Sequence, residues 1–440
     1  METFLIKTLQ LLASLSLMVI IHEFGHFLWA RVFKIRVESF YLFFNPWFSL
    51  FKWKPKNSET TYGIGWVPLG GYVKIAGMID ESMDKEQMKK PAQPWEFRSK
   101  PAWQRLLVMI GGVVSNFLLA IVIYAGIAWW WGEKTIPYQN AYEGMDFTEA
   151  AQQLGFQNGD ILLTADGKKI DSRERAVLYN MLESDEVKVL RNHRDTVTLH
   201  IPDGVVAKMA QDEVFMAFRL PVFVKQIMPG EPAEQAGLLE GDRIVGVADI
   251  KTPAYTEFAP ALMQYAGREV DLTILRGNDT IVAKAVPSEA GKLGFGLMSL
   301  TDVYECEVTQ YGFFQSIPVG ISNGTNMLVT YVGSLKHVFS KEGAESIGGF
   351  GAIGSLFPSA WNWRVFWEMT AFLSIILAFM NILPIPALDG GHVLFLLWEV
   401  ITRRKPSEKF LEYAQMTGMA LLFILLIYAN FNDIYRFLIK

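Results

Sequence analysis

The chain has 440 residues, of which 51% are hydrophobic and 19% are charged. It is too apolar for an ordinary soluble protein and too charged to lie wholly in lipid, so we expect several membrane helices and at least one soluble domain. The net charge of −5 argues against nucleic acid as a partner. The single cysteine, Cys306, excludes an intramolecular disulfide and a thiolate metal cluster. Any metal must therefore be bound by histidines and carboxylates.

Four long apolar segments predict membrane-spanning helices, at about 4–30, 106–131, 365–388 and 412–431. Lys and Arg are concentrated between the first two segments and after the third. The positive-inside rule then places both loops in the cytoplasm, with both termini and residues 132–364 on the other side. The first segment could instead be a signal peptide, because Lys7 precedes its apolar run. No small-residue cleavage site follows that run, which continues into the sequence HEFGHFLW.

The first apolar segment ends in the pattern H-E-x-x-H, formed by His22, Glu23 and His26. Helical residues four apart share a face, so both imidazoles can bind one metal ion while Glu23 lies beside its open position. Neutral imidazoles suit Zn²⁺, which needs a third protein ligand in a catalytic site. Glu23 could then take a proton from a metal-bound water. The alternative is a histidine pair packed in a helix bundle without a metal.

The third apolar segment contains the sequence NILPIPALDGGH, which supplies candidates for the third ligand. Pro384 and Pro386 should break the helix, which lets Asn381 and Asp389 approach one point. Asp389 is the favoured ligand because a buried carboxylate without a cation is unfavourable, and His392 is the competing one. Asn381 could donate a hydrogen bond to an oxyanion. The plainer alternatives are a helix cap, a proline kink and an interhelical hydrogen bond.

The first cytoplasmic loop contains YGIGWVPLGGYVKIAGM at 62–78, where apolar residues alternate with glycines. This alternation predicts one membrane-associated β-hairpin that turns back toward the bilayer. An unpaired edge of the hairpin could hold a substrate in extended form, although an ordinary surface hairpin is an alternative. The candidate substrate-binding residues of the loop are Gly63, Gly65, Pro68, Gly70 and Gly71.

The external segment contains an internal repeat, since the sequence at 149–170 resembles that at 234–252. At one constant offset, Gly155, Gly159 and Asp160 align with Gly237, Gly241 and Asp242. Repetition at this spacing indicates two copies of one fold, and the pattern resembles PDZ domains of bacterial membrane proteases. Two spacer domains without ligands are the alternative.

These segments predict five parts of the chain. They are a first membrane part at 1–131, PDZ-like domains at 132–220 and 221–305, a segment at 306–364 and a last membrane part at 365–440. The segment 306–364 has an amphipathic stripe, which predicts a helix on the external membrane surface. Its glycine-rich stretch at 346–360 is expected to be a flexible gate.

Taken together, HEFGH, PLGGYVK, the two GD repeats and NILPIPALDGGH resemble the site-2 protease family of intramembrane metalloproteases, in its branch with two external PDZ domains. The resemblance covers nearly the whole chain. It implies a polytopic α-helical membrane protein with two inserted α+β PDZ domains. It also implies one Zn²⁺ per chain held by His22, His26 and Asp389, with Glu23 as the catalytic base and Asn381 in contact with the substrate or oxyanion.

The second apolar segment departs from the family pattern. It reads GGVVSNF, where the family usually has Gly-Pro, two further residues and Asn. Val113 stands in place of the proline, so less of a kink is expected there. The asparagine of the family pattern is present as Asn116, for which we expect a structural or substrate-contacting role.

The resemblance further implies cleavage of single-span membrane proteins already shortened by another protease, such as anti-sigma factors and remnant signal peptides. The expected location is the inner membrane of a bacterium, with both termini and the PDZ domains in the periplasm. The PDZ domains are expected to exclude bulky substrates or to bind peptide C-termini. Two other functions remain as alternatives: a PDZ scaffold with a non-catalytic metal site, and a metal transporter. The complete ligand set with Glu23 argues against the scaffold, and the lack of a visible repeat of membrane segments argues against the transporter.

Overall fold

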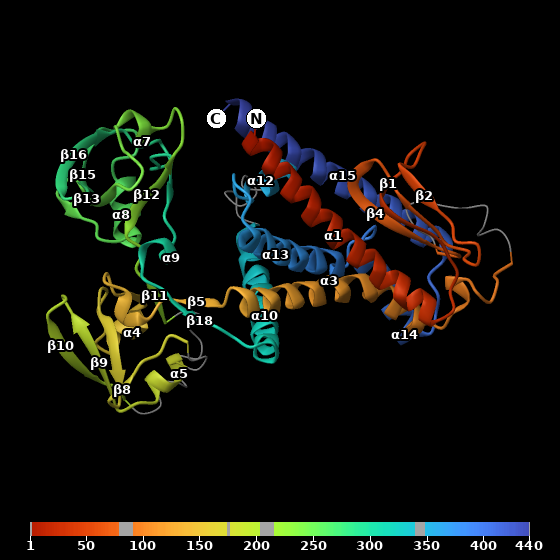
Figure 1. The fold of residues 1–440 in the computed structure, drawn as a ribbon, viewed down its shortest axis with the longest axis horizontal. Coiled ribbons are helices and arrows are strands. Elements are labelled where there is room, and N and C mark those ends of the chain that lie inside the picture. Colours follow the sequence, from red (N-terminus) through yellow and green to blue (C-terminus); the bar gives the residue numbers. More distant parts are fainter. Residues whose placement is uncertain (1, 79–90, 174–176, 203–214, 339–347, 440) are drawn as a thin grey trace. The chain divides into compact units, whose positions relative to one another are not determined.

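The computed structural model describes all residues except 1, 79–90, 174–176, 203–214, 339–347 and 440 (Figure 1). The chain divides into two compact units. We call Met1–Gly132 together with Gln310–Lys440 the membrane unit, and Glu133–Thr309 the inserted unit. The predicted segment 306–364 is thus divided, because all of its residues from 310 onward belong to the membrane unit.

In the part of the chain that the structure describes, four helices are long and apolar enough to cross a membrane. They are α1 (Glu2–Val32), α3 (Ala102–Trp130), α13 (Trp363–Ile382) and α15 (Glu408–Ile439). They lie at the four predicted segments, and α3 continues without a break through Val113. Apolar side chains on their outer faces are exposed, as expected for helices that lipid surrounds.

A fifth long helix, α10 (Phe313–Val338), packs against α3 and α13. A Cβ at Gly320 would lie 2.6 Å from both Ala125 N and Ile121 O of α3, so glycine is needed for this close approach. The sequence predicted a helix on the membrane surface here, and its stripe of small and apolar residues also serves a helix–helix contact. The short helix α12 (Phe350–Ser355) lies within the predicted glycine-rich gate, of which residues 346 and 347 lie outside the described residues.

The loop between α1 and α3 forms a four-stranded sheet with the order β2-β3-β1-β4. Its strands are β1 (Val37–Phe44), β2 (Phe51–Trp53), β3 (Thr61–Ile64) and β4 (Val67–Ile75). The predicted hairpin over 62–78 would pair β3 with β4. This pairing is wrong, because β1 lies between the two strands and pairs with both. A two-stranded hairpin is marginal by itself, and insertion of β1 buries Val37 and Tyr41. The strand β4 is left at the edge of the sheet, where it packs against α1.

A helix that the sequence did not predict, α14 (Asp389–Thr402), follows the proline-containing segment. It packs against α3, where a buried ion pair joins Arg105 Nη2 to Glu399 Oε1 at 2.5 Å. Breaking such a pair leaves an uncompensated buried charge, so the contact fixes α14 on α3.

The inserted unit contains two α+β halves, entered and left through the pair β5 (Glu133–Thr135) and β18 (Glu307–Thr309). The first half contains β6 (Met145–Phe147), α4 (Glu149–Gln153), β7 (Ile161–Ala165), β8 (Lys168–Lys169), α5 (Val177–Leu182), β9 (Glu186–Arg191), β10 (Asp195–His200) and β11 (Met216–Phe218). The second contains β12 (Val222–Ile227), α7 (Pro232–Gln235), β13 (Arg243–Val247), β14 (Ile250–Lys251), α8 (Tyr255–Met263), β15 (Val270–Arg276), β16 (Asp279–Ala285) and β17 (Phe295–Leu297), followed by α9 (Leu300–Val303). Each half has its own hydrophobic core.

The repeated aspartates make the same contacts in both halves. Asp160 accepts two hydrogen bonds from the Arg191 guanidinium, at 2.8 and 2.7 Å. Asp242 accepts two from the Arg276 guanidinium, both at 2.8 Å, and this partner holds the pKa of Asp242 below its ordinary value. Each aspartate also accepts a backbone N–H from three residues earlier. The GD repeat of the sequence therefore corresponds to one repeated structural feature.

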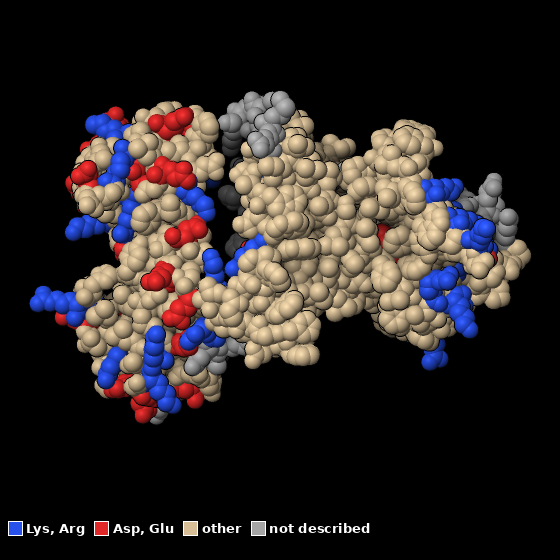
Figure 2. Space-filling model, viewed as in Figure 1, with Lys and Arg blue, Asp and Glu red and all other residues tan. Residues whose placement is uncertain are grey.

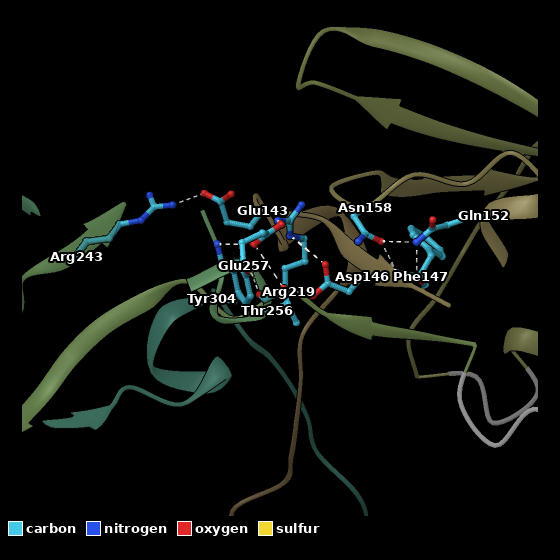
Figure 3. Close-up of polar contacts among 11 residues, drawn as sticks. Glu143, Asp146, Phe147, Gln152, Asn158, Arg219, Arg243, Thr256, Glu257 and Tyr304 are labelled. Carbon is cyan, nitrogen blue, oxygen red and sulfur yellow. Dashed lines mark hydrogen bonds and ion pairs between the residues drawn. The ribbon is translucent and has the colours of Figure 1, made fainter. Parts of the chain in front are cut away.

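A buried ion cluster joins the two halves at Arg219 (Figure 3). The Arg219 side chain pairs with Asp146 of β6 at 3.3 Å and with Glu257 of α8. Thr256 donates a hydrogen bond of 2.8 Å to Asp146, and Tyr304 donates one of 2.6 Å to the Arg219 carbonyl. The buried charge of Arg219 is stable only while it is paired, so its contacts with both halves fix them on each other.

Candidate metal centre

His22, His26 and Asp389 meet at one point in the membrane unit, and their ligand atoms lie within 4.8 Å of one another. Asp389 Oδ2 lies 3.1 Å from His22 Nε2 and 3.2 Å from His26 Nε2. The two Nε2 atoms are 3.2 Å apart. The competing candidate, His392, lies in the same cavity but does not belong to this group of three.

The helical spacing of His22 and His26 puts both rings on the face of α1 that packs against α3. Glycines make this contact close: a Cβ at Gly111 would lie 2.6 Å from Gly25 O, and one at Gly112 would overlap the His26 ring. Nδ1 of His26 lies 2.8 Å from Val108 O, and since a carbonyl only accepts, this nitrogen carries a proton. In the neutral ring, Nε2 of His26 then presents its lone pair to the centre.

Asp389 reaches the centre because α13 ends at Ile382 and α14 begins at Asp389. Between them the chain makes a turn in which Ala387 has a φ of 81°, a left-handed conformation that is strained for alanine. The N–H of Ala387 donates to Gln415 Oε1 of α15 at 3.2 Å, which holds the turn. As the first residue of a helix, the Asp389 carboxylate also lies at the favourable end of the helix dipole. The third predicted membrane segment ends at about residue 388, and Asp389 is the first residue of the next helix.

These donor atoms fit a tetrahedral zinc ion. Zn–N and Zn–O bonds of about 2.0–2.2 Å place tetrahedral ligand atoms about 3.3–3.6 Å apart, so the 3.1–3.2 Å separations observed here need to widen by only a few tenths of an ångström. Oδ2 of Asp389 is buried, and neither imidazole meets it in hydrogen-bonding geometry. Three lone-pair donors held this close to one another require a cation or protons between them. The chemistry of the group therefore suits a divalent metal with nitrogen and oxygen ligands.

A cavity of about 740 Å³ opens beside this group. Glu23 and Asn381 line it, as does the whole stretch of β4 from Gly70 to Ile75. The backbone of Val73 lies close enough to Glu23 to stabilise its carboxylate, so the edge strand β4 passes beside the part of α1 that carries Glu23. Asn381 Nδ2 lies 3.4 Å from His22 Nε2. A base, an amide donor and the edge strand of a sheet therefore surround the candidate metal position.

The other predicted substrate-binding residues divide into two groups. Pro68, Gly70 and Gly71 line the cavity. Gly63 and Gly65 lie outside its lining, where a Cβ on either would overlap Tyr41 or Phe44 of β1. Asn116 is fully buried beside His22 and does not line the cavity either.

Sequence reasoning missed Val108, Gly112, Val73 and Gln415. The adjacent glycines 111 and 112 in an apolar segment were a signal of close helix packing. Val108 and Val73 act through backbone groups, and Gln415 comes from a helix far along the chain. The sequence carries no local signal for either kind of contact.

Comparison with known proteins agrees with this site. The model of Peptidase family M50 matches residues 10–425. Metalloprotease MmpA of Caulobacter vibrioides is 28% identical over 99% of this chain and 96% of its own length. Regulator of sigma E protease of Haemophilus influenzae is 27% identical over 96% of this chain and 97% of its own, and Protease RseP of Yersinia pestis is 27% identical over 97% of each.

The chain belongs to peptidase family M50, since the match covers nearly its whole length. It is an intramembrane metalloprotease of the site-2 type, and zinc is the metal of this family. The four membrane-length helices in the described part of the chain, together with its bacterial relatives, make it a bacterial inner-membrane protein that acts on membrane-bound substrates.

Proposed function

We propose that the enzyme cleaves peptide bonds within the membrane helices of single-span proteins, with His22, His26 and Asp389 as zinc ligands and Glu23 as catalytic base. The observation that carries this proposal is the convergence of the three ligand atoms beside Glu23, in one cavity of a unit built from membrane-length helices. A scissile bond in a membrane helix can reach this position without leaving the bilayer.

Bound zinc would supply Lewis acid chemistry, which acidifies a water and polarises the scissile carbonyl. Glu23 takes the proton of the attacking water and returns it to the leaving amide nitrogen. The Val73 backbone lies beside Glu23 and is placed to stabilise its carboxylate during this transfer. Asn381 lies near the candidate metal position and donates a hydrogen bond to the developing oxyanion.

The substrate binds as an extended strand alongside β4, the edge strand of the described sheet. A helical peptide bond is closed to attack by its own hydrogen bonds, so the substrate helix must unwind first. The edge of β4 offers backbone partners for the unwound segment, and it passes directly beside Glu23. Pro68, Gly70 and Gly71 contact the substrate through the cavity, while Gly63 and Gly65 keep β3 close to β1.

Replacing Gly71 with valine is expected to lower kcat/KM by about 10²-fold without releasing zinc. A Cβ at Gly71 would lie 2.6 Å from Tyr41 O and 2.7 Å from Val19 Cγ1, so β4 must move away from α1. The measurement is cleavage of a truncated single-span substrate, with zinc content determined on the same sample. Gly126→Val on α3 is the control, because a Cβ there has no neighbour within 4 Å. Unchanged cleavage by Gly71→Val would contradict substrate binding on β4.

The end of the membrane unit that carries β1–β4 and α14 faces the cytoplasm, and the termini and the inserted unit face the periplasm. On the face shown in Figure 2, this end carries Lys and Arg with few acidic residues, and the rest of the membrane unit is largely uncharged. Lys52, Lys54 and Lys56 are exposed there. This charge distribution follows the positive-inside rule.

The two halves of the inserted unit are PDZ domains that screen substrates for size. Their repeated GD turns and the open sheet edge at β17 support the assignment, and the Arg219 cluster makes them one body. A rigid body outside the membrane can exclude proteins that still carry a large external domain. Substrates shortened by another protease, such as anti-sigma factors and remnant signal peptides, pass this filter, and their new C-termini are candidate PDZ ligands.

Replacing Glu133–Thr309 with a flexible linker is therefore expected to permit cleavage of an intact single-span protein that the full enzyme leaves uncut. The measurement is cleavage in cells of one substrate with and without its periplasmic domain. The truncated substrate is the control, because both enzymes should cut it. If the intact substrate stayed as resistant as before, the filter, or the periplasmic placement of the inserted unit, would be wrong.

A further inference from the structure

One stripe of α3 faces both candidate zinc histidines. It consists of Val108, Gly112 and Asn116, which are spaced four residues apart and so lie one above another on the helix. Val108 O lies 2.8 Å from His26 Nδ1. Gly112 leaves room for both rings, since a Cβ there would overlap His26 and lie 2.7 Å from His22 Cε1. Asn116 Nδ2 lies 3.4 Å from His22 Nδ1.

The stripe thus contacts the Nδ1 atoms of both histidines. The backbone carbonyl of Val108 lies beside His26, and the side-chain amide of Asn116 lies beside His22. A neutral imidazole carries one proton, so a ring that binds zinc through Nε2 must carry it on Nδ1. That proton needs an acceptor, particularly in a buried site. Val108 O is the acceptor for His26, and the equivalent acceptor for His22 must come from Asn116, the residue beside its Nδ1.

The second observation is an unsatisfied atom. Asn116 is 0% exposed, and its Oδ1 is buried without a hydrogen-bond partner among the residues that the structure describes. The backbone at this position is held separately, since Ser374 Oγ donates a hydrogen bond of 2.8 Å to Asn116 O. A half-turn of the amide exchanges its oxygen and nitrogen, which brings the unsatisfied acceptor to the N–H that needs one.

We propose that Asn116 is a positioning residue that accepts a hydrogen bond from Nδ1–H of His22 and so holds the ring in the tautomer whose Nε2 binds zinc. The inference rests on the proposed ligand role of His22. It replaces the expected substrate contact of Asn116, which is fully buried and does not line the cavity. Hydrogen-bond partners of this kind orient metal-binding histidines and strengthen their binding.

The test is zinc affinity of the full-length protein, measured by competition with a chelator. Asn116→Leu and Asn116→Ala both remove the acceptor, the second without added bulk, and each is expected to weaken zinc binding about 10–100-fold. Asn116→Asp keeps an acceptor at the same position, so its zinc affinity should stay within a few fold of that of the natural protein. Ser374→Ala is the matched control, because it removes a buried contact of the same residue without touching His22, and it should leave zinc affinity unchanged.

Thermal unfolding of the zinc-free proteins separates positioning from a general loss of structure. Rescue by Asp with similar zinc-free stability of all the variants supports the proposal. Zinc affinity unchanged in both Asn116→Leu and Asn116→Ala overturns it, and a raised KM in those variants would assign Asn116 to the substrate. Equal weakening in the Leu, Ala and Asp variants overturns it as well, because an acceptor would then make no difference. His22→Ala tests the underlying assignment separately: it loses zinc if the proposed centre is correct, whatever Asn116 does.

Discussion

Replacing Glu23 with glutamine is expected to reduce cleavage about 10²–10⁴-fold while one zinc per chain remains bound. Glutamine has nearly the same shape, but it cannot take a proton from water. The Nε2 atoms of His22 and His26 and Oδ2 of Asp389 are untouched by the change. The measurement is cleavage of a truncated single-span substrate by purified natural and variant proteins, with zinc determined on both.

Glu59→Gln is the control for this experiment, since Glu59 is exposed and outside the cavity. Its cleavage rate should match that of the natural protein. A Glu23→Gln protein with full activity would exclude Glu23 as the base and would revive the scaffold alternative, in which the metal site is not catalytic.

Replacing Asp389 with alanine is expected to remove both zinc and activity. In the proposed centre the carboxylate supplies one of three protein ligands, and its Oδ2 lies within 3.2 Å of both histidine nitrogens. A centre left with two imidazoles binds zinc much more weakly, so zinc content after dialysis should fall well below one per chain. The measurement is metal analysis together with the cleavage assay.

His392→Ala provides the comparison, because His392 lies in the same cavity and was the competing candidate for third ligand. It is expected to retain zinc. The reverse result, with zinc lost in His392→Ala and kept in Asp389→Ala, would assign the third ligand to His392. Loss of zinc transport without any loss of cleavage in either variant would instead favour the transporter alternative.

The sequence determined which segments are long and apolar enough to enter the membrane and which residue types lie together in the proposed metal centre. Membrane helices are determined by local composition, since about 20 apolar residues cross a bilayer whatever surrounds them. The H-E-x-x-H pattern is equally local, because helical geometry alone puts His22 and His26 on one face. The break after Ile382 follows from Pro384 and Pro386, which cannot continue a helix.

Pairings between distant segments were decided only by the tertiary structure. Alternation predicted strands in 62–78, but strand partners depend on long-range contacts, and β1 separates β3 from β4. The helix α14 was missed because the charged residues that follow it resemble a loop, and its place is held by the distant pair Arg105–Glu399. The amphipathic pattern of α10 suits either a membrane surface or a helix–helix contact, and only packing against α3 distinguishes them.

The surroundings of the metal ligands are the clearest case of this division. The sequence predicted His22, His26 and Asp389 as ligands, and the structure brings these three together, but the groups beside them were not predicted. Val108 and Val73 act through backbone groups, which every residue carries. Asn116 stands out in the sequence as a polar residue in an apolar segment. Its neighbour His22 lies 94 positions earlier, and only the packing of α1 against α3 brings the two side chains together. Residue types and spacing are local properties, whereas the orientation of a side chain depends on whatever the fold brings next to it.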